Sequence, residues 1–160
     1  MHEKSITLLN AAVADEMSAV HQYMYFHFHC DDQGYDPLAA LFKRTAIEEM
    51  LHIERIAERI LFLKGDVEMV SSGPVEKVTD VAAMLKMAKE LEEKAIVDYN
   101  RYANECSQNA DSVSKTLFES LVVDEERHYD QFETQEEHLE RFGEQFLALQ
   151  SFERGKMMGG

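Results

Sequence analysis

Hydrophobic residues recur every three or four positions through long stretches of the chain. Leu9, Ala12, Ala19, Tyr23 and Phe26 follow this spacing near the N-terminus, and similar series occur in every later block. The spacing places apolar side chains on one face of an α-helix, whereas the strict alternation that is typical of half-buried strands is absent. The pattern therefore predicts an all-α protein.

Glycine and proline residues divide the chain into helix-sized blocks. We expect four long helices and a short fifth one, at residues 3–33, 38–64, 80–107, 113–141 and 144–154. A length of 160 residues suits one domain, which we place at residues 1–154. Residues 155–160 are expected to form a flexible tail.

The connections between these blocks indicate how the helices are ordered. The first two helices and the next two are joined by short segments, which favours two antiparallel hairpins. The segment between the hairpins, residues 65–79, can span roughly 50 Å when extended, whereas a helix of 27 residues is only about 40 Å long. This linker can cross the whole bundle, so an up-down-down-up arrangement is possible.

The charge of the chain restricts its partners. Asp and Glu number 31 against 16 Lys and Arg, which gives a formal net charge of −15. Such a surface repels phosphate backbones and anionic lipids but attracts cations, so we expect no nucleic-acid or membrane partner. No long apolar run is present, and Cys30 and Cys106 are too few for a disulfide scaffold. We expect a soluble, cytoplasmic protein with two free thiols.

Two Glu-x-x-His motifs are candidates for metal binding: Glu49-x-x-His52 and Glu125-x-x-His128. Residues three apart project from the same helical face, where a carboxylate and an imidazole can share one metal ion. With this many Glu and His residues, about one such pair is expected by chance, and a solvated acidic face is the alternative interpretation.

An internal repeat strengthens the metal hypothesis. Glu16 precedes Glu49 by the same spacing with which Glu92 precedes Glu125 (49 − 16 against 125 − 92). The two hairpins therefore carry one pattern at a constant offset (125 − 49 and also 92 − 16), which is typical of a degenerate duplication. The same offset relates two further pairs, Tyr23 with Tyr99 and Cys30 with Cys106.

The four glutamates lie on apolar helix faces, which implies that they are buried. An unpaired buried carboxylate costs several kcal/mol, and a cluster of four is mutually repulsive unless protons or cations neutralise it. Two divalent cations would balance four carboxylates, and a set of oxygen ligands with one imidazole per metal suits iron or manganese. Buried ion pairs are the alternative. Tyr23 can hydrogen-bond a bridging carboxylate or supply an electron, or it is an ordinary buried aromatic residue.

These residues, together with the stretch IEEMLHIERIAERILFLKG at 47–65, resemble bacterioferritin, the haem-containing branch of the ferritin family. The similarity runs from about residue 3 to residue 154. It implies that Glu16 and His52 bind one iron and that Glu92 and His128 bind the other. Glu49 and Glu125 would bridge the two ions. It further implies a ferritin-like bundle in a hollow cage of 24 subunits that oxidises ferrous iron with dioxygen or peroxide and stores it as a ferric mineral.

Met50 bears on the haem. It lies about 100° around the helix from Glu49 and about 160° from His52, so it points away from the metal face. In the family this methionine ligates haem b from each of two subunits across a two-fold axis; the alternative is a methionine that fills a gap in a dimer interface. The resemblance also makes an electron-donor protein for iron release a possible partner.

Two other functions compete with ferroxidase and iron storage. One is a di-iron oxygenase or peroxidase without storage, which would use a similar carboxylate pair. The other is a non-catalytic helical assembly protein. A cage mass would favour storage, and a dimer would favour the oxygenase.

Overall fold

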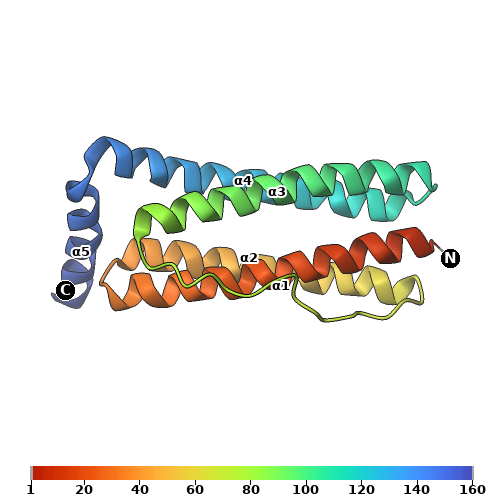
Figure 1. Cartoon of the computed structure of the whole chain (residues 1–160), viewed down its shortest axis with the longest axis horizontal. Coiled ribbons are helices and arrows are strands. Elements are labelled where there is room, and N and C mark those ends of the chain that lie inside the picture. The colour runs from red at the N-terminus through yellow and green to blue at the C-terminus, as the bar shows by residue number, and fades with distance from the viewer. Residues whose placement is uncertain (1, 160) are drawn as a thin grey trace.

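A computed structural model describes the backbone of residues 2–159 and the side chains of residues 2–152. Four long helices lie side by side, and a fifth crosses one end of the bundle (Figure 1). The helices are α1 (Glu3–Asp32), α2 (Asp36–Phe62), α3 (Val81–Gln108), α4 (Ser112–Phe142) and α5 (Glu144–Gly159). The described part of the chain has no strand, which confirms the all-α prediction.

The helices follow an up-down-down-up order. α1 and α2 form one antiparallel hairpin, α3 and α4 form the other, and the linker between them returns along the whole bundle before α3 begins (Figure 1). The predicted ferritin-like topology with a long crossover is therefore confirmed. Within the described residues, no helix is both long enough and apolar enough to span a bilayer.

The linker is held along α1 by three polar side chains. The Asn10 amide donates to the carbonyl of residue 66 and accepts from the N–H of residue 68. The Gln22 amide makes the same two kinds of bond with the backbone of Glu76. Between them, the Ser18 hydroxyl accepts the N–H of Ser72 at 2.9 Å. These bonds satisfy backbone groups that no helix or sheet pairs.

The hydrophobic core is divided into two clusters. One contains Phe26, Phe42 and Phe132, and the other contains Leu9, Ile56 and Phe118. Tyr23 belongs to the first cluster and Tyr99 to the second. The clusters lie toward opposite ends of the bundle, so a layer of different composition remains between them.

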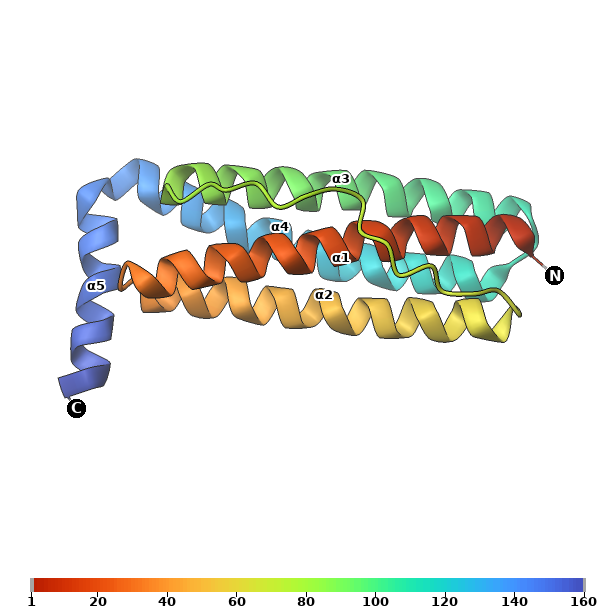
Figure 2. The ribbon, with the colours of Figure 1, turned by 60° about the horizontal axis from the view of Figure 1, so that its bottom comes forward.

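α5 closes one end of the bundle (Figure 2). Phe146 and Leu147 pack on the first core cluster, and the Gln150 side chain accepts the N–H of Leu38 at 3.1 Å. This helix continues to Gly159, beyond the end at residue 154 that we predicted. The side chains of the predicted tail at 155–160 lie outside the described residues, and its flexibility stays a prediction.

Cys30 and Cys106 are buried and free, as expected. The Cys30 thiol donates to the Met84 sulfur, and the Cys106 thiol contacts the Ser5 hydroxyl. Burial raises the pKa of Cys30 to about 12. A thiol of this kind stays protonated and unreactive at neutral pH.

The turn between α3 and α4 depends on Asp111. One of its carboxylate oxygens caps α4 by accepting the N–H of Ser114 at 3.1 Å and also accepts from Arg59 of α2 at 2.6 Å. We expect Asp111→Ala to destabilise the chain by about 1–3 kcal/mol, since it removes the cap and the carboxylate with which Arg59 pairs. The midpoint of thermal unfolding should be lower in Asp111→Ala than in the wild-type protein. The midpoint of Asp111→Asn, which keeps a cap acceptor, should lie between these two values. An unchanged midpoint for the alanine variant would contradict this role.

Candidate metal centre

Six buried polar side chains meet in the layer between the core clusters. Each long helix contributes to this layer, and each side chain is at most 3% exposed. They are Glu16 of α1, Glu49 and His52 of α2, Glu92 of α3, and Glu125 and His128 of α4. The structure thus brings together all six ligands predicted from the sequence.

The six side chains form two groups of four that could each hold a metal ion. Glu16 and His52 belong only to the first group, and Glu92 and His128 belong only to the second. Glu49 and Glu125 belong to both. This division matches the predicted pair of sites in which two carboxylates are shared.

The distances agree with shared ligands. The Nδ1 atom of His52 lies 3.1 Å from Glu125 Oε1 and 3.4 Å from Glu49 Oε1. The Nδ1 atom of His128 lies 3.1 Å from the same Glu49 oxygen and 3.7 Å from the same Glu125 oxygen. Two ligand atoms bound at about 2.1 Å to one cation are themselves about 3.0–3.4 Å apart. Three of the four distances lie in this range and the fourth is slightly longer, so one oxygen of Glu49 and one of Glu125 are close to the inner nitrogens of both groups.

Each of the six predicted ligands has one buried polar atom for which the described residues provide no hydrogen-bond partner. Among the described residues, seven buried side-chain polar atoms lack one, and six of these belong to the predicted ligands. The six atoms are Glu16 Oε2, Glu49 Oε1, His52 Nδ1, Glu92 Oε2, Glu125 Oε1 and His128 Nδ1. Since a buried polar atom without a partner is costly, one such atom on every member of the set indicates that the cluster is completed by something that accepts lone pairs. Divalent cations fit this requirement.

The far nitrogen of each imidazole is held by a carboxylate from the opposite helix. His52 Nε2 lies 2.9 Å from Asp124, and His128 Nε2 lies 2.5 Å from Glu48, which Arg127 also contacts at 2.6 Å. A carboxylate on the outer nitrogen fixes the orientation of the ring and leaves the inner nitrogen free for a metal.

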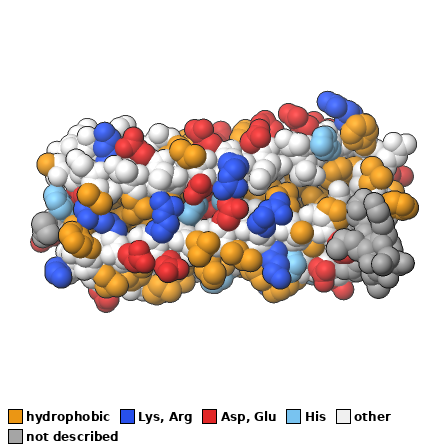
Figure 3. All heavy atoms as spheres, turned by 180° about the vertical axis from the view of Figure 1, so that it is seen from behind, with side chains coloured by type: hydrophobic (Ala, Val, Ile, Leu, Met, Phe, Trp, Pro, Cys, Tyr) orange, Lys and Arg blue, Asp and Glu red, His pale blue; other side chains and the backbone are white. Residues whose placement is uncertain are grey.

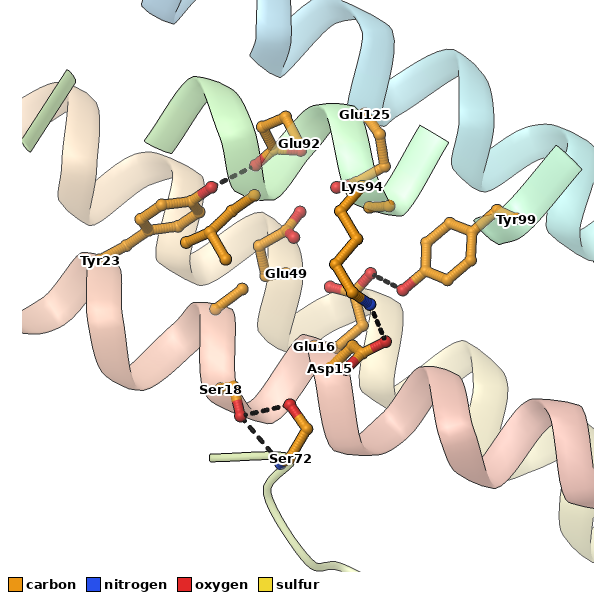
Figure 4. A pocket seen from close by; sticks show the side chains of 13 residues that line it. Asp15, Glu16, Ser18, Tyr23, Glu49, Ser72, Glu92, Lys94, Tyr99 and Glu125 are labelled. Carbon is orange, nitrogen blue, oxygen red and sulfur yellow. Dashed lines mark hydrogen bonds and ion pairs between the residues drawn. The ribbon is translucent and has the colours of Figure 1, made fainter. Parts of the chain in front are cut away.

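Glu16 and Glu92, the two glutamates that each belong to one group only, are held in a similar way by phenols. Tyr23 of α1 donates to Glu92 Oε1 at 2.6 Å, and Tyr99 of α3 donates to Glu16 Oε1 at 2.5 Å (Figure 4). The interpretation of Tyr23 as a partner of a bridging carboxylate is corrected, because the carboxylate that it bonds belongs to one group only. In both glutamates the second oxygen is the one without a partner.

Crowding of charge shifts the pKa values of this centre. Burial, with added repulsion from Glu16, raises the pKa of Glu49 and Glu125 well above their usual range. Burial opposes protonation of the imidazoles, yet the contact with Glu16 raises the pKa of His52 to about 9, and Glu49 and Glu92 raise that of His128 to about 11. Without metal, the cluster therefore retains protons at neutral pH.

A pocket of about 150 Å³ leads to the centre. It lies between α1 and α3, its inner wall includes Glu16, Glu49, Glu92 and Glu125, and Ser72 of the linker lines it as well (Figure 4). The Lys94 ammonium lies beside this pocket and pairs with Asp15 at 3.3 Å and with Asp98 at 2.8 Å. Small ions can thus approach the glutamates from the side of the bundle.

Met50 lies outside this centre. Its side chain is 51% exposed, whereas those of its neighbours in the motif, Glu49 and His52, are buried. Ile47, one turn earlier, is 43% exposed. In the view from behind, hydrophobic side chains gather over the half of the surface formed by α2 (Figure 3). The sequence prediction that Met50 points away from the metal face agrees with this exposure.

Sequence reasoning did not assign three outer contacts of the centre: Glu48, Asp124 and Tyr99. The internal repeat contained a signal for all of them. The offset that relates the two hairpins also maps Glu48 onto Asp124 (124 − 48) and Tyr23 onto Tyr99 (99 − 23). The signal was incomplete because spacing does not show which groups on different helices touch.

A bundle of four long helices with a short crossing helix, built around carboxylates and imidazoles, defines the ferritin-like class of proteins. A comparison with family models agrees, because the ferritin family model, described as a ferritin-like domain, matches residues 6–142.

Curated relatives narrow the class. The bacterioferritin of Desulfovibrio desulfuricans is 35% identical over 91% of this chain and 81% of its own length, and that of Rhodobacter capsulatus is 37% identical over 91% of both. The chain belongs to the bacterioferritins.

Solved structures of bacterioferritins from the same two species superpose closely. The D. desulfuricans structure, which addresses a diiron site in different catalytic states, has a TM-score of 0.91 and 34% identity over 92% of this chain and 86% of that chain. The R. capsulatus structure, with a metal-free dinuclear site and haem iron in a crystallographic special position, has a TM-score of 0.89 and 35% identity over 93% of both chains.

Proposed function

We propose that this protein oxidises ferrous iron at the six-residue centre and stores the ferric product. The observation that carries this proposal is the set of six ligand atoms without partners, divided into two groups that share Glu49 and Glu125. Oxygen-rich sites with one imidazole each suit iron or manganese better than copper. Two divalent cations also neutralise four carboxylates whose burial would otherwise be unfavourable.

The residues have distinct tasks in this proposal. Glu16 and His52 bind one ferrous ion, Glu92 and His128 bind the other, and Glu49 and Glu125 hold the two ions close together. Each ferrous ion gives up one electron. The two electrons reduce dioxygen with two protons to hydrogen peroxide, or hydrogen peroxide with two protons to two molecules of water. Tyr23 keeps Glu92 in place while the charge of the ions changes.

Storage requires an assembly, which we propose to be a cage of 24 chains built from two-fold dimers. Such a cage would carry a formal charge of −360 (24 × −15), which concentrates ferrous ions around it. The exposed apolar side chains of α2 are suited to a subunit interface. A cytoplasmic location agrees with the two free thiols.

Haem b is a second part of the proposal. The exposed Met50 thioether stands on an apolar helix face, which is a surface that suits haem and a ligand that haem iron accepts. Met50 of two chains would hold one haem across a two-fold axis. Haem supplies one-electron transfer when bound, and an electron-donor protein would use it to release the stored iron.

The main alternative, an oxygenase or peroxidase acting on an organic substrate, is disfavoured by the pocket. Its volume of about 150 Å³ is smaller than the roughly 300–1,000 Å³ of sites that enclose organic ligands. The pocket admits ions, dioxygen and hydrogen peroxide.

Metal loading tests the centre without relying on its reaction. We expect the metal-free protein to bind two Co²⁺ ions per chain and to release protons, because a cation must displace the protons that His52 and His128 retain at neutral pH. The sign of the pH dependence follows: affinity should rise between pH 6 and pH 8, since fewer protons then compete. A titration followed by absorbance and by a pH indicator measures both quantities.

Fewer than two ions per chain, or binding without proton release, would contradict the proposed centre. Size-exclusion chromatography with mass detection tests storage separately. We expect an assembly with 24 times the 18.4 kDa mass of one chain, and a dimer would contradict the cage.

A further inference from the structure

We propose that Tyr99 is a positioning residue for the metal site of Glu16 and His52, the counterpart of Tyr23 at the other site. This inference rests on the proposed function, because it assigns a role within the same centre. The internal repeat relates the two tyrosines but does not show what either contacts. The structure supplies the contacts.

Each phenol reaches across from one hairpin to the other. Tyr23 lies on α1 and donates to Glu92 of α3, whereas Tyr99 lies on α3 and donates to Glu16 of α1. Both tyrosines follow a ligand glutamate of their own helix by seven residues. The internal repeat that relates the two hairpins therefore also relates these two hydrogen bonds. Both bonds join α1 to α3, one on each side of the centre (Figure 4).

The two oxygens of Glu16 have different surroundings. Oε1 accepts the phenol proton of Tyr99 at 2.5 Å, and Oε2 is buried without a partner and lies 3.5 Å from the inner nitrogen of His52. A carboxylate held by one oxygen cannot rotate freely, so its other oxygen stays directed at the cation. Among the described residues, the Tyr99 phenol is the one side chain that donates a hydrogen bond to Glu16.

The position of the phenol is fixed by its surroundings. The Tyr99 ring is 1% exposed and packs against Phe118 with ring centroids 5.8 Å apart and against Tyr102 at 6.1 Å. Tyr23 is equally enclosed by Phe42 and Phe132. Each core cluster thus places one tyrosine hydroxyl against a glutamate: Tyr23 against Glu92 and Tyr99 against Glu16. Removing the hydroxyl alone leaves the ring packing in place.

Tyr99→Phe tests the inference through metal binding. We expect one Co²⁺ to bind as it does to the wild-type protein and the other to bind about 10–100-fold more weakly, with an altered visible cobalt spectrum. Tyr23→Phe should show the same loss at the opposite site. Tyr102→Phe is the matched control: its ring contacts Tyr99, it does not line the pocket, and it should bind both ions normally.

Two further variants identify which ion is affected. In His52→Ala, which lacks the imidazole of the Glu16 site, adding Tyr99→Phe should change the remaining cobalt affinity little. In His128→Ala, which keeps the Glu16 site, adding Tyr99→Phe should weaken the remaining cobalt about 10–100-fold. The thermal midpoint of each metal-free variant checks that it folds.

The outcomes separate this inference from the proposed function. If the wild-type protein fails to bind two cobalt ions, the proposed centre itself is wrong. If it binds two, and Tyr99→Phe binds both with unchanged affinity and spectrum, Tyr99 has no positioning role. If Tyr99→Phe weakens the remaining cobalt ion equally in His52→Ala and in His128→Ala, the effect is one of general packing, and the inference would also be overturned.

Discussion

Glu49→Ala is expected to reduce the rate of rapid ferrous oxidation by more than about 100-fold. Removing an outer partner of a metal ligand typically costs about 10–100-fold in metal affinity or activity, and Glu49, which belongs to both candidate groups, is proposed to be a direct ligand. Its loss removes one carboxylate from each site and one of the two bridges that keep the ions together. Stopped-flow measurement of ferric absorbance after mixing with ferrous iron and dioxygen gives the rate.

The variant should nevertheless fold. Glu49 is a buried carboxylate whose pKa is raised by burial and by repulsion from Glu16 and Glu92, so its removal relieves an unfavourable interaction that offsets part of the cavity left behind. We expect the thermal midpoint of the metal-free variant to stay close to that of the wild-type protein. The rise in this midpoint on adding Co²⁺ should be lost, because stabilisation follows binding.

Glu54→Ala is the matched control. Glu54 lies on the same helix, is exposed and is not one of the grouped ligands. Its loss removes one formal negative charge from the same helix, so this variant measures how much an exposed carboxylate contributes to the attraction of ferrous ions. A wild-type oxidation rate in Glu49→Ala would remove Glu49 from the proposed centre.

Most of the fold could be predicted because it depends on local rules. Apolar spacing and the positions of glycine and proline located the four long helices to within a few residues, as the bounds of α1 and α4 show. The predicted end of α5 at residue 154 was wrong, because the helix continues through Gly155 to Gly159. A single glycine lowers helix stability but does not force a helix to end. The long crossover of the linker was predicted, but its bonds to Asn10, Ser18 and Gln22 were not, because they join residues far apart in the sequence.

The six ligands of the centre could be predicted from the sequence, whereas the residues that hydrogen-bond those ligands could not. Its six ligands share a repeat whose spacing is visible in one dimension, so Glu16 and Glu92 could be paired with the two His motifs from the order of residues alone. The outer contacts are decided by which helices face each other across the bundle. Glu48 holds the imidazole of α4 and not that of its own helix, and Tyr99 holds the glutamate of α1. Sequence spacing relates these residues to one another but does not show which helices they contact.

Met50→Leu is expected to abolish haem binding while leaving the assembly and the six-residue centre intact. Leucine is close to methionine in volume and hydrophobicity, so an interface that buries the apolar face of Ile47 and Met50 should lose less than about 1.5 kcal/mol. The substitution removes only the sulfur atom, and with it the group that can ligate haem iron. The absorption spectrum of the purified protein after reconstitution with haem measures occupancy, with an expected wild-type value of one haem per two chains.

Met50→Leu distinguishes the two interpretations of Met50, as a ligand of haem iron or as a side chain that fills a gap in a dimer interface. Met69 is 56% exposed, close to the 51% of Met50, but lies in the linker and not on α2, so Met69→Leu should retain haem. If Met50 only fills a gap between two chains, Met50→Leu will keep both the dimer contact and the haem spectrum of the wild-type protein. Because the Met50 side chain is exposed and those of Glu49 and His52 are buried, the leucine variant should still bind two Co²⁺ ions. Loss of haem with retention of both cobalt ions would therefore place electron transfer and iron oxidation on opposite faces of one helix.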